Sequence, residues 1–204
     1  MRSETSERSR ACRLIWVRHA SPEGEGLFLG QSDVPLSTKG RRQLPRLAEK
    51  ISQYPAQAVY SSDLQRARAT AAAISRRHKV EVKILSGLRE IHFGRWQGLS
   101  WAEVAKRFPR AARPWQKGFP RERIPGGEDF AGFKRRVRRT LIKIVAAHPG
   151  GCAIIVAHAG VLRVVIASAL GIRDRYLFRI ALDYGQVNVI DYFPDSAIVR
   201  CVNG

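Results

Sequence analysis

The sequence predicts an α/β fold: a three-layer α/β/α sandwich with a mostly parallel central sheet, one antiparallel edge strand and a small cap insertion. Short apolar runs alternate with helical stretches along the chain, which is the order of strands and crossover helices in a parallel sheet. Two runs, at residues 14–17 and 152–157, are apolar throughout, as expected of strands covered on both faces. A length of 204 residues fits one such domain, over residues 12–204.

The composition excludes several other classes of protein. Hydrophobic residues make up 45% of the chain and charged residues 26%, which is typical of folded domains rather than of disordered chains, collagen or coiled coils. Residues 1–11 are rich in Ser, Arg and Glu and nearly lack apolar side chains. We therefore expect a disordered tail there, because burial cannot offset the entropy of ordering such a segment.

The first half of the predicted domain begins with the strand at residues 14–17, which ends at the turn 18–20. A loop rich in Gly and Pro leads to a helix for which Ser37 is the expected N-cap. Residues 58–60 form a short strand, and residues 61–63 offer caps for the next helix. The apolar side chains of that helix recur at helical spacing: Leu64, Ala67, Ala71 and Ile74.

The middle of the chain breaks the regular alternation. Residues 80–85 read as a third strand, and the pattern then becomes irregular from 87 to 127, with several Trp, Pro and Gly residues. We expect a cap or lid over about residues 96–124, because long irregular excursions in compact domains tend to be functional. A long amphipathic helix is predicted at 128–147.

The last third of the chain returns to strands and helices. The apolar strand at 152–157 is followed by an apolar helix at 161–170. Residues 187–193 and 197–202 read as two strands joined by the turn 194–196, which predicts a hairpin at or near the end of the sheet.

The charge of the chain is unusual. It has 36 Lys and Arg against 17 Asp and Glu, a formal net charge of +19. Such a chain attracts polyanions, so nucleic acid, an acidic membrane surface and phosphorylated small molecules are all candidate partners. Charge alone does not choose among them.

The sequence favours a cytoplasmic protein that does not associate with membranes. No apolar run approaches the roughly 20 residues needed to span a bilayer, and the start of the chain has no signal-peptide pattern. The three cysteines form no C-x-x-C pair and leave an odd thiol, which argues against a disulfide framework or a structural zinc site.

Two histidines follow the two most apolar strands. His19 and His158 each come directly after a strand and are each followed by a small residue. Ligands of open α/β sheets bind at the carboxyl ends of the strands, so we expect the two imidazoles to face one another there. Metal binding is disfavoured because no third ligand with suitable spacing is present, and because Arg18 attracts an anion rather than a cation.

Six blocks of sequence, in this order, resemble the histidine phosphatase superfamily, also called phosphoglycerate-mutase-like. The similarity spans about residues 13–193. The blocks are Arg18-His19-Ala20, residues 35–40, residues 61–67, Leu88-Arg89-Glu90 with residues 93–98, residues 125–128 and Ala157-His158-Ala159-Gly160.

The resemblance implies catalytic roles for five residues. His19 matches the nucleophile, which takes the phosphoryl group to give a phosphohistidine that water hydrolyses. Glu90 matches the proton donor for the leaving alkoxide, which later activates water. Arg18, Arg66 and His158 match the groups around the phosphoryl group, whose charge guanidinium forks stabilise without a metal. The resemblance therefore implies no cofactor and no metal.

The resemblance also implies a set of substrate contacts. Three departures concern them: Ala20 replaces the usual Gly, Ser21-Pro22 stand where Glu-Thr or similar residues are common, and the loop up to Gly30 lacks the Asn that often contacts phosphate. Gln31 or backbone groups would substitute for that Asn. The residues expected to bind the substrate are Arg18, Ser21, Gln31, Arg66, His158 and Ala159.

The motifs narrow the expected substrate. Phosphoglycerate mutases of this family carry longer insertions, so the compact cap favours a phosphomonoesterase. Residues 93–98 and 178–191 are similar to α-ribazole phosphatases, which remove a 5′-phosphate during cobalamin assembly. A broad-specificity sugar or nucleotide phosphatase has nearly the same motifs, and it stays open together with a phosphoglycerate mutase.

A basic nucleic-acid-binding α/β module is the alternative from another class. It is motivated by the net charge and by the run at residues 134–139, which we expect on the helix face opposite Phe130, Phe133 and Val137. Charge runs usually coat solvated surfaces, and no nucleic-acid motif accompanies this one, so nucleic acid is not the expected partner. We expect a small phosphorylated substrate, with a homodimer as one option for assembly.

Overall fold

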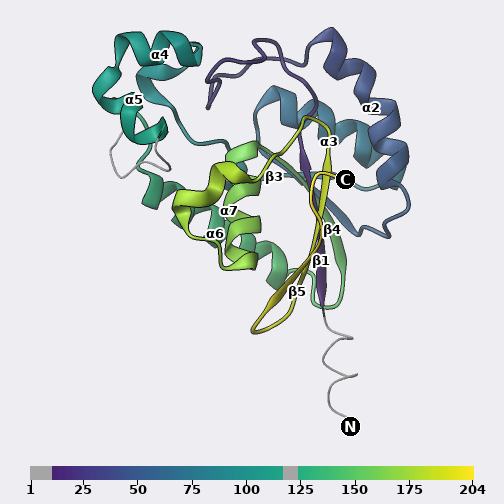
Figure 1. Cartoon of the computed structure of the whole chain (residues 1–204). Helices are drawn as coiled ribbons and strands as arrows, with labels where there is room; N and C mark the ends of the chain where they lie inside the picture. The colour runs from purple at the N-terminus through teal and green to yellow at the C-terminus, as the bar shows by residue number, and fades with distance from the viewer. Residues whose placement is uncertain (1–10, 117–123) are drawn as a thin grey trace.

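The computed structural model describes residues 11–116 and 124–204, and it confirms the predicted fold class. Six strands form one sheet in the order β3-β2-β4-β1-β5-β6 (Figure 1). The predicted tail lies, except for Ala11, outside the described residues, as does part of the predicted cap, residues 117–123.

Four strands form the parallel part of the sheet. They are β1 (Cys12–Arg18), β2 (Ala58–Ser61), β3 (Val82–Ile84) and β4 (Cys152–Ala157). β1 and β4 pair side by side with Arg18 opposite Ala157, so both strands end at the same level. β3 is shorter than the predicted strand at 80–85, because only its residues 82–84 pair with β2.

The other side of the sheet is an antiparallel hairpin. β5 (Val187–Tyr192) pairs antiparallel with β1, and β6 (Ala197–Cys201) pairs antiparallel with β5 at the edge. The predicted antiparallel edge is therefore two strands wide, and β5 is the strand that runs against the others.

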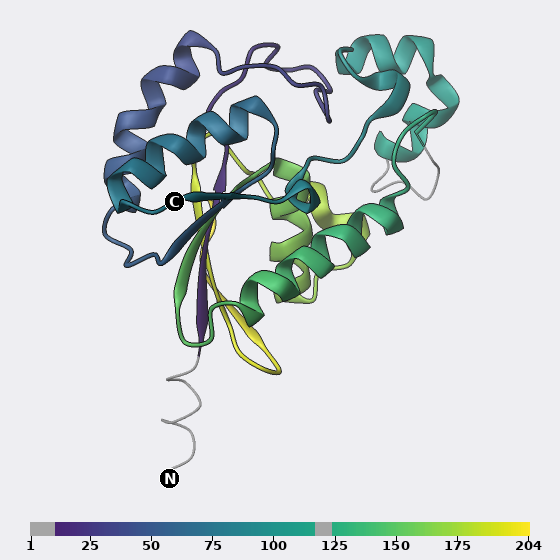
Figure 2. The same ribbon diagram turned by 180° about the vertical axis from the view of Figure 1, so that it is seen from behind.

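Two helices cover each face of the sheet. α2 (Thr38–Ile51) and α3 (Gln65–His78) lie on one face, and α6 (Phe130–Ala146) and α7 (Ala159–Leu170) lie on the other (Figures 1 and 2). Alternate residues of each strand supply the two cores. Against α2 and α3 the strands bury Ile15, Val17, Val59, Ile154 and Val156. Against α6 and α7 they bury Leu14, Trp16, Tyr60, Ala153 and Ile155.

The helix starts show where local sequence decides the structure and where it does not. Ser37 caps α2 as predicted, since its hydroxyl accepts a hydrogen bond from the Gly40 N–H at 3.0 Å. The caps predicted at 61–63 for α3 are wrong: the N-cap is Leu64, and Asp33, from a distant loop, accepts from the Gln65 N–H. α7 begins directly after His158, two residues earlier than predicted.

The excursion after β3 contains short helices that the irregular sequence did not predict. These are the 3₁₀ turns η1 (Ser86–Leu88) and η2 (Gly94–Trp96), followed by α4 (Trp101–Arg107) and α5 (Pro109–Gln116). α4 and α5 stand beyond the end of the sheet, to one side of α7 (Figure 1). They pack on an aromatic cluster of their own around Trp96. One further turn, η3 (Asp174–Arg179), follows α7.

None of the helices formed by the described residues is both long enough and apolar enough to cross a membrane.

Candidate active site

The two histidines meet at the carboxyl end of the sheet, as the sequence predicts. His19 and His158 are the residues that follow the last pair of the β1–β4 ladder. Their ring centroids lie 4.9 Å apart, and the rings are tilted by 59°. Both side chains are buried. The parallel register of β1 and β4 brings two imidazoles from distant parts of the chain into contact.

The hydrogen bonds of His19 fix its tautomer. Nδ1 lies 2.8 Å from the carbonyl oxygen of Ala20, which can only accept, so Nδ1 carries the proton. Nε2 accepts a hydrogen bond from Nε of Arg66 at 3.3 Å. Burial, reinforced by the charge of Arg66, holds the pKa of His19 well below its usual value. His19 is therefore a neutral imidazole with its lone pair on Nε2.

Two arginines flank His19. Arg66 is fully buried, and its guanidinium donates to the carbonyls of Ser32 and Gly30 at 2.6 and 2.7 Å. Arg18 stacks on Tyr184, with 3.5 Å between the guanidinium carbon and the ring centroid. Burial lowers the pKa of both arginines, but from so high a value that both stay charged. The result is a rigid cationic wall beside a neutral imidazole.

Glu90 is held by the start of α7. Its Oε2 accepts a hydrogen bond from the Gly160 N–H at 3.0 Å, and its Oε1 accepts one from the Ile91 N–H at 2.9 Å. A carboxyl group can accept both of these hydrogen bonds in its ionised or its protonated form, so they fix the orientation of Glu90. A Cβ at Gly160 would lie 2.2 Å from Oε1 of Glu90, so this contact requires glycine.

Arg136 fixes the backbone on both sides of Glu90. From the middle of α6 it donates to the carbonyls of Gly87, Arg89 and Glu90 at 2.8–3.3 Å. It also pairs with Glu128, 2.7 Å away. The expectation that the basic run at 134–139 lies on one solvated face is therefore wrong for Arg136. Its side chain points back to the loop that carries Glu90.

His158 shares a hydrogen bond of 2.8 Å between its Nε2 and the hydroxyl of Ser62. Its Nδ1 is buried and has no hydrogen-bond partner among the described residues. Burial and the neighbouring His19 hold the pKa of His158 well below its usual value. When Ser62 donates to Nε2, the proton of His158 is on Nδ1.

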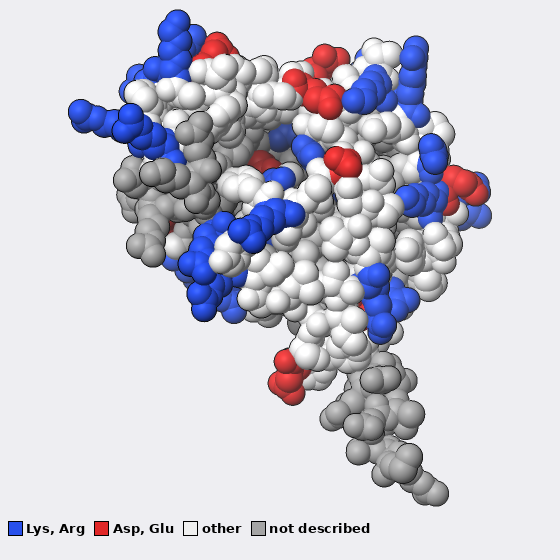
Figure 3. Space-filling view, viewed as in Figure 1, with Lys and Arg blue, Asp and Glu red and all other residues white. Residues whose placement is uncertain are grey.

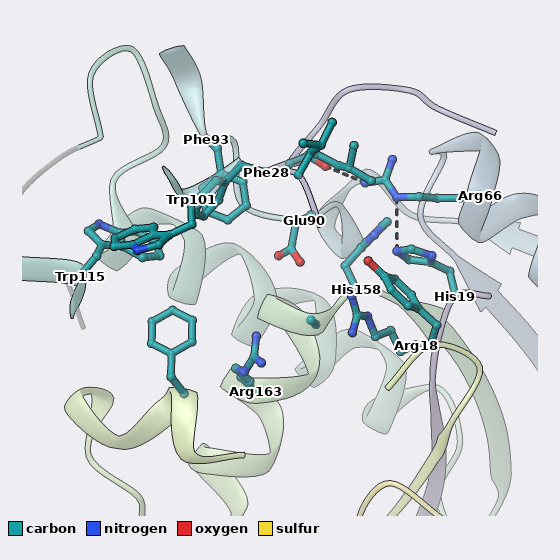
Figure 4. A pocket seen from close by; sticks show the side chains of 16 residues that line it. Arg18, His19, Phe28, Arg66, Glu90, Phe93, Trp101, Trp115, His158 and Arg163 are labelled. Carbon is teal, nitrogen blue, oxygen red and sulfur yellow. Dashed lines mark hydrogen bonds between the residues drawn. The ribbon is translucent and has the colours of Figure 1, made fainter. Parts of the chain in front are cut away.

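These groups line one cavity of about 490 Å³ that has two chemically different halves (Figure 4). His19, His158, Arg18 and Arg66 lie on one side, and Glu90 and Arg163 stand between the halves. The other half is formed by aromatic side chains: Phe28, Phe93, Trp101, Trp115 and Phe178. The cavity can therefore hold a phosphate-sized anion beside the histidines and an apolar or aromatic group beyond it.

Not all of the predicted substrate contacts lie in this cavity. Ala159 lines it, but Ser21 and Gln31 do not. Ser21 is buried beneath the site, where its hydroxyl donates to Glu25 at 2.8 Å. Gln31 Nε2 donates to the backbone carbonyl of Glu90 at 3.1 Å, so both side chains support neighbouring loops.

Several residues of the site were missed by sequence reasoning. Arg163 follows Gly160 by three residues on α7, a spacing that places both on one face of the helix and could have revealed it. Ser62 and Arg136 gave no local signal, because only the tertiary fold brings them to His158 and Glu90. No group of three or more His, Cys, Asp or Glu side chains within 11–116 and 124–204 is arranged to hold a metal ion.

The high positive charge is dispersed on the face that carries the cavity. In the space-filling view, Lys and Arg side chains are scattered over this face, both at its edges and in and beside its central hollow (Figure 3). Some of the basic residues are paired, as Lys134 is with Asp174 at 2.6 Å.

Comparison with known proteins places this geometry in a family. The model of the histidine phosphatase superfamily (branch 1) matches residues 14–204. A protein of Mycobacterium tuberculosis described as bifunctional is 32% identical over 98% of this chain. This chain spans only 56% of the length of that relative.

Relatives of similar length are named as phosphatases. The adenosylcobalamin/alpha-ribazole phosphatase of Salmonella typhimurium is 30% identical, over 94% of this chain and 96% of its own length. The crystal structure of the alpha-ribazole phosphatase from Shigella flexneri superposes with a TM-score of 0.83 at 27% identity, covering 94% of this chain and 96% of that one. The mycobacterial glucosyl-3-phosphoglycerate phosphatase reaches a TM-score of 0.84 at 26% identity, covering 94% and 98%. This chain belongs to the histidine phosphatase superfamily, branch 1.

Proposed function

We propose that this chain is a metal-independent phosphomonoesterase that works through a phosphohistidine on His19, and that its substrate is α-ribazole 5′-phosphate. The observation that carries the proposal is the approach of His19, His158, Arg66 and Glu90 to one cavity. A neutral imidazole supplies the nucleophile, arginines bind the anion, and a carboxyl group is in place to move the proton.

The first step transfers the phosphoryl group. The lone pair of His19 Nε2 forms a bond to phosphorus while the bond from phosphorus to the ester oxygen breaks. Arg18, Arg66 and the Nδ1–H of His158 bind the equatorial oxygens as their charge redistributes. Glu90, protonated at this stage, gives its proton to the departing oxygen. Such general acid catalysis contributes about 10²- to 10⁴-fold.

The second step regenerates the enzyme. Glu90, now a carboxylate, takes a proton from a water molecule whose oxygen attacks phosphorus. The bond between phosphorus and Nε2 breaks, and its electron pair returns to the imidazole. Inorganic phosphate leaves, and Glu90 is again protonated. No step requires a metal, because Arg18 and Arg66 supply the positive charge that a cation would otherwise provide.

The substrate assignment rests on two supports. Relatives named as alpha-ribazole phosphatases match nearly the whole chain in sequence and in structure. The aromatic half of the cavity suits the flat ring system of an α-ribazole leaving group. A broad-specificity phosphatase is the runner-up, since other relatives are named for phosphoserine and for glucosyl-3-phosphoglycerate.

Trapping of the intermediate tests the mechanism. After incubation with a ³²P-labelled substrate and a rapid alkaline quench, mass spectrometry should place an acid-labile phosphate on His19. His19→Ala should lose the label and reduce turnover by several orders of magnitude. Full turnover by His19→Ala would overturn the mechanism. EDTA should leave the rate unchanged, and loss of activity after chelation would contradict a metal-independent reaction.

A panel of phosphomonoesters tests the substrate. α-Ribazole 5′-phosphate, nucleoside monophosphates, sugar phosphates and 3-phosphoglycerate should be ranked by kcat/KM. A value for α-ribazole 5′-phosphate well above all others supports the assignment. Comparable values across the panel would instead support the broad-specificity enzyme, and formation of 2-phosphoglycerate would support a mutase.

The proposal includes a cytoplasmic location and no nucleic-acid partner. The three cysteines are free thiols, and two of them, Cys12 and Cys152, are buried in neighbouring strands, which suits a reducing compartment. Filter binding to duplex DNA at several salt concentrations tests the second statement. Submicromolar affinity with a steep salt dependence would favour the nucleic-acid-binding alternative.

A further inference from the structure

Arg163 is a charged side chain of the cavity that the two catalytic steps do not use. It belongs to the first turns of α7, three residues after the Gly160 N–H that holds Glu90. Figure 4 places Arg163 between the histidines and the aromatic half, on the opposite side from Phe28 and Phe93. Arg163 therefore borders the space between the histidines and the aromatic side chains.

The guanidinium of Arg163 is held in place, but not all of its N–H donors have an acceptor. Its Nε donates to the carbonyl of Ile180 at 3.3 Å, and its central carbon lies 5.2 Å from the ring centroid of Phe178. Within the described parts of the chain no hydrogen bond or ion pair engages its Nη1 or Nη2. Burial lowers the pKa of Arg163, and the charge of Glu90 opposes that shift. Partly buried guanidinium groups are costly unless an acceptor satisfies them.

The charge balance of the occupied cavity indicates what that acceptor is. Arg18, Arg66 and Arg163 carry three positive charges, and a phosphomonoester dianion brings two negative ones. Glu90 balances the third charge only while it is ionised. In the proposed first step Glu90 is protonated, which leaves one positive charge beside the leaving group without a counter-charge.

We propose that Arg163 forms a carboxylate-binding subsite, which selects phosphomonoesters whose leaving group carries an anionic substituent next to an apolar or aromatic body. This inference rests on the proposed phosphohistidine mechanism, and it competes with α-ribazole 5′-phosphate as the substrate, because the α-ribazole leaving group carries no anionic substituent. A planar carboxylate can accept both free Nη donors of Arg163 at once. The nearby aromatic side chains exclude water and strengthen that pair.

A simpler role for Arg163 makes a different prediction. If Arg163 only tunes Glu90, its removal shifts the pH dependence of every substrate by the same amount. A binding role instead changes the ratio between a charged substrate and its neutral isostere. Each substrate is compared between the wild type and the variant, so differences in the intrinsic reactivity of the leaving groups cancel from the ratio of kcat/KM values.

The experiment uses four aryl phosphates on the full chain. The charged pair is 3- and 4-carboxyphenyl phosphate, and the neutral isosteres are 3- and 4-carbamoylphenyl phosphate. Values of kcat/KM are measured for the wild type, Arg163→Met, Arg163→Lys and the control Arg139→Met, whose side chain is exposed on α6. Thermal melting verifies that each variant folds, and Arg163→Gln replaces Arg163→Met if that variant does not.

The wild type should prefer at least one carboxylate over its amide by roughly 10- to 150-fold, the range of one charge-assisted interaction. Arg163→Met should abolish that preference, Arg163→Lys should keep part of it, and Arg139→Met should leave it unchanged. Equal rates for acid and amide in the wild type, or an undiminished preference in Arg163→Met, would overturn the subsite. Failure of the wild type to hydrolyse any of the four esters, without phosphate on His19, would instead overturn the proposed function.

Discussion

Gly160 decides whether Glu90 can act as the proton donor. Its N–H binds the carboxylate, and it has no Cβ to push that group away. Gly160→Ala should displace Glu90 and slow the hydrolysis of alkyl phosphates by about 10²- to 10⁴-fold, the usual contribution of general acid catalysis. p-Nitrophenyl phosphate should be much less affected, because its leaving group needs no proton. Steady-state kinetics with both substrates measure the difference.

The matched control is Gly132→Ala, a second helical glycine. A Cβ at Gly132 finds its nearest atom, Oδ2 of Asp129, at 3.5 Å, which is an ordinary contact. This variant should keep the activity of the wild type on both substrates. If Gly160→Ala slowed both substrates equally, or neither, the role of the glycine in placing Glu90 would be refuted.

Ser62 controls which nitrogen of His158 can reach the phosphoryl group. Ser62→Ala removes the partner of Nε2, so the ring loses both its orientation and the reason to keep its proton on Nδ1. We expect kcat to fall by roughly 5- to 100-fold, the effect of one lost buried hydrogen bond. The neighbouring variant Ser61→Ala, whose hydroxyl donates to the Ser62 carbonyl, is the control. Unchanged kcat in Ser62→Ala would contradict the assignment.

At the residue scale, the sequence identifies groups that sit directly at strand ends. His19 and His158 are of this kind, because the strand register alone determines where they lie. Ser62 and Arg136 reach the site through the packing of separate elements, and a single sequence does not contain that information. Gln31 is the opposite case: the sequence suggested it as a substrate contact, but its side chain donates to the backbone carbonyl of Glu90.

At the scale of elements, α6 positions the loop that carries Glu90. Arg136→Met would remove the hydrogen bonds that Arg136 donates to three backbone carbonyls and to the Glu128 carboxylate, although Gln31 would still donate to the Glu90 carbonyl. The free energy of unfolding should fall by about 1–3 kcal/mol, and the rate on alkyl phosphates should fall more than the rate on p-nitrophenyl phosphate. Urea unfolding and paired kinetics measure the two effects.

Arg139→Met provides the comparison on the same helix. Arg139 is exposed, and none of the described residues pairs with it, so its replacement should change stability by less than about 0.5 kcal/mol. Equal losses in both variants would show that α6 contributes helix stability alone and does not hold the loop.

Apolar periodicity predicted the strands and the long helices because those elements bury regular faces. It failed where other features decide the structure. α4 begins with a capping box in which Ser100 and Glu103 bind each other's backbone, a signature readable in the sequence but obscured by the surrounding Trp and Pro residues. The start of α3 has no local cap at all, since Asp33 supplies the acceptor from another loop.

At the scale of the whole molecule, the fold carries an energetic cost for its buried site. Two neutral imidazoles and the Arg66 guanidinium are removed from water at one end of the sheet, and Arg18 lies half-buried beside them. The interior of the sheet supports them with two extensive apolar cores. Hydrogen bonds place His19, Arg66 and Glu90 before substrate arrives, which favours electrostatic stabilisation of the transition state.

This burial makes stability depend on pH in a predictable direction. The pKa values of His19 and His158 are lowered well below 6.5 in the folded protein, whereas the unfolded chain binds a proton on each below about pH 6.5. The stability that the protein gains by keeping both imidazoles neutral is complete above pH 6.5. It is lost as the pH falls toward the lowered pKa values of the folded protein. Over that interval each imidazole reduces the free energy of unfolding by about 1.4 kcal/mol per pH unit.

The variant His19→Asn removes one of the two imidazoles and leaves burial, the main cause of the low pKa of His158, in place. Urea unfolding of wild type and variant at several pH values between 7.5 and 4.5 gives two stability curves. Their difference should be constant above about pH 6.5 and should change in favour of the variant by about 1.4 kcal/mol per unit below it, because asparagine binds no proton in either state. A difference that stayed constant throughout would mean that His19 titrates as it does in the unfolded chain. The neutral nucleophile on which the phosphohistidine mechanism depends would then be a minority form near pH 6.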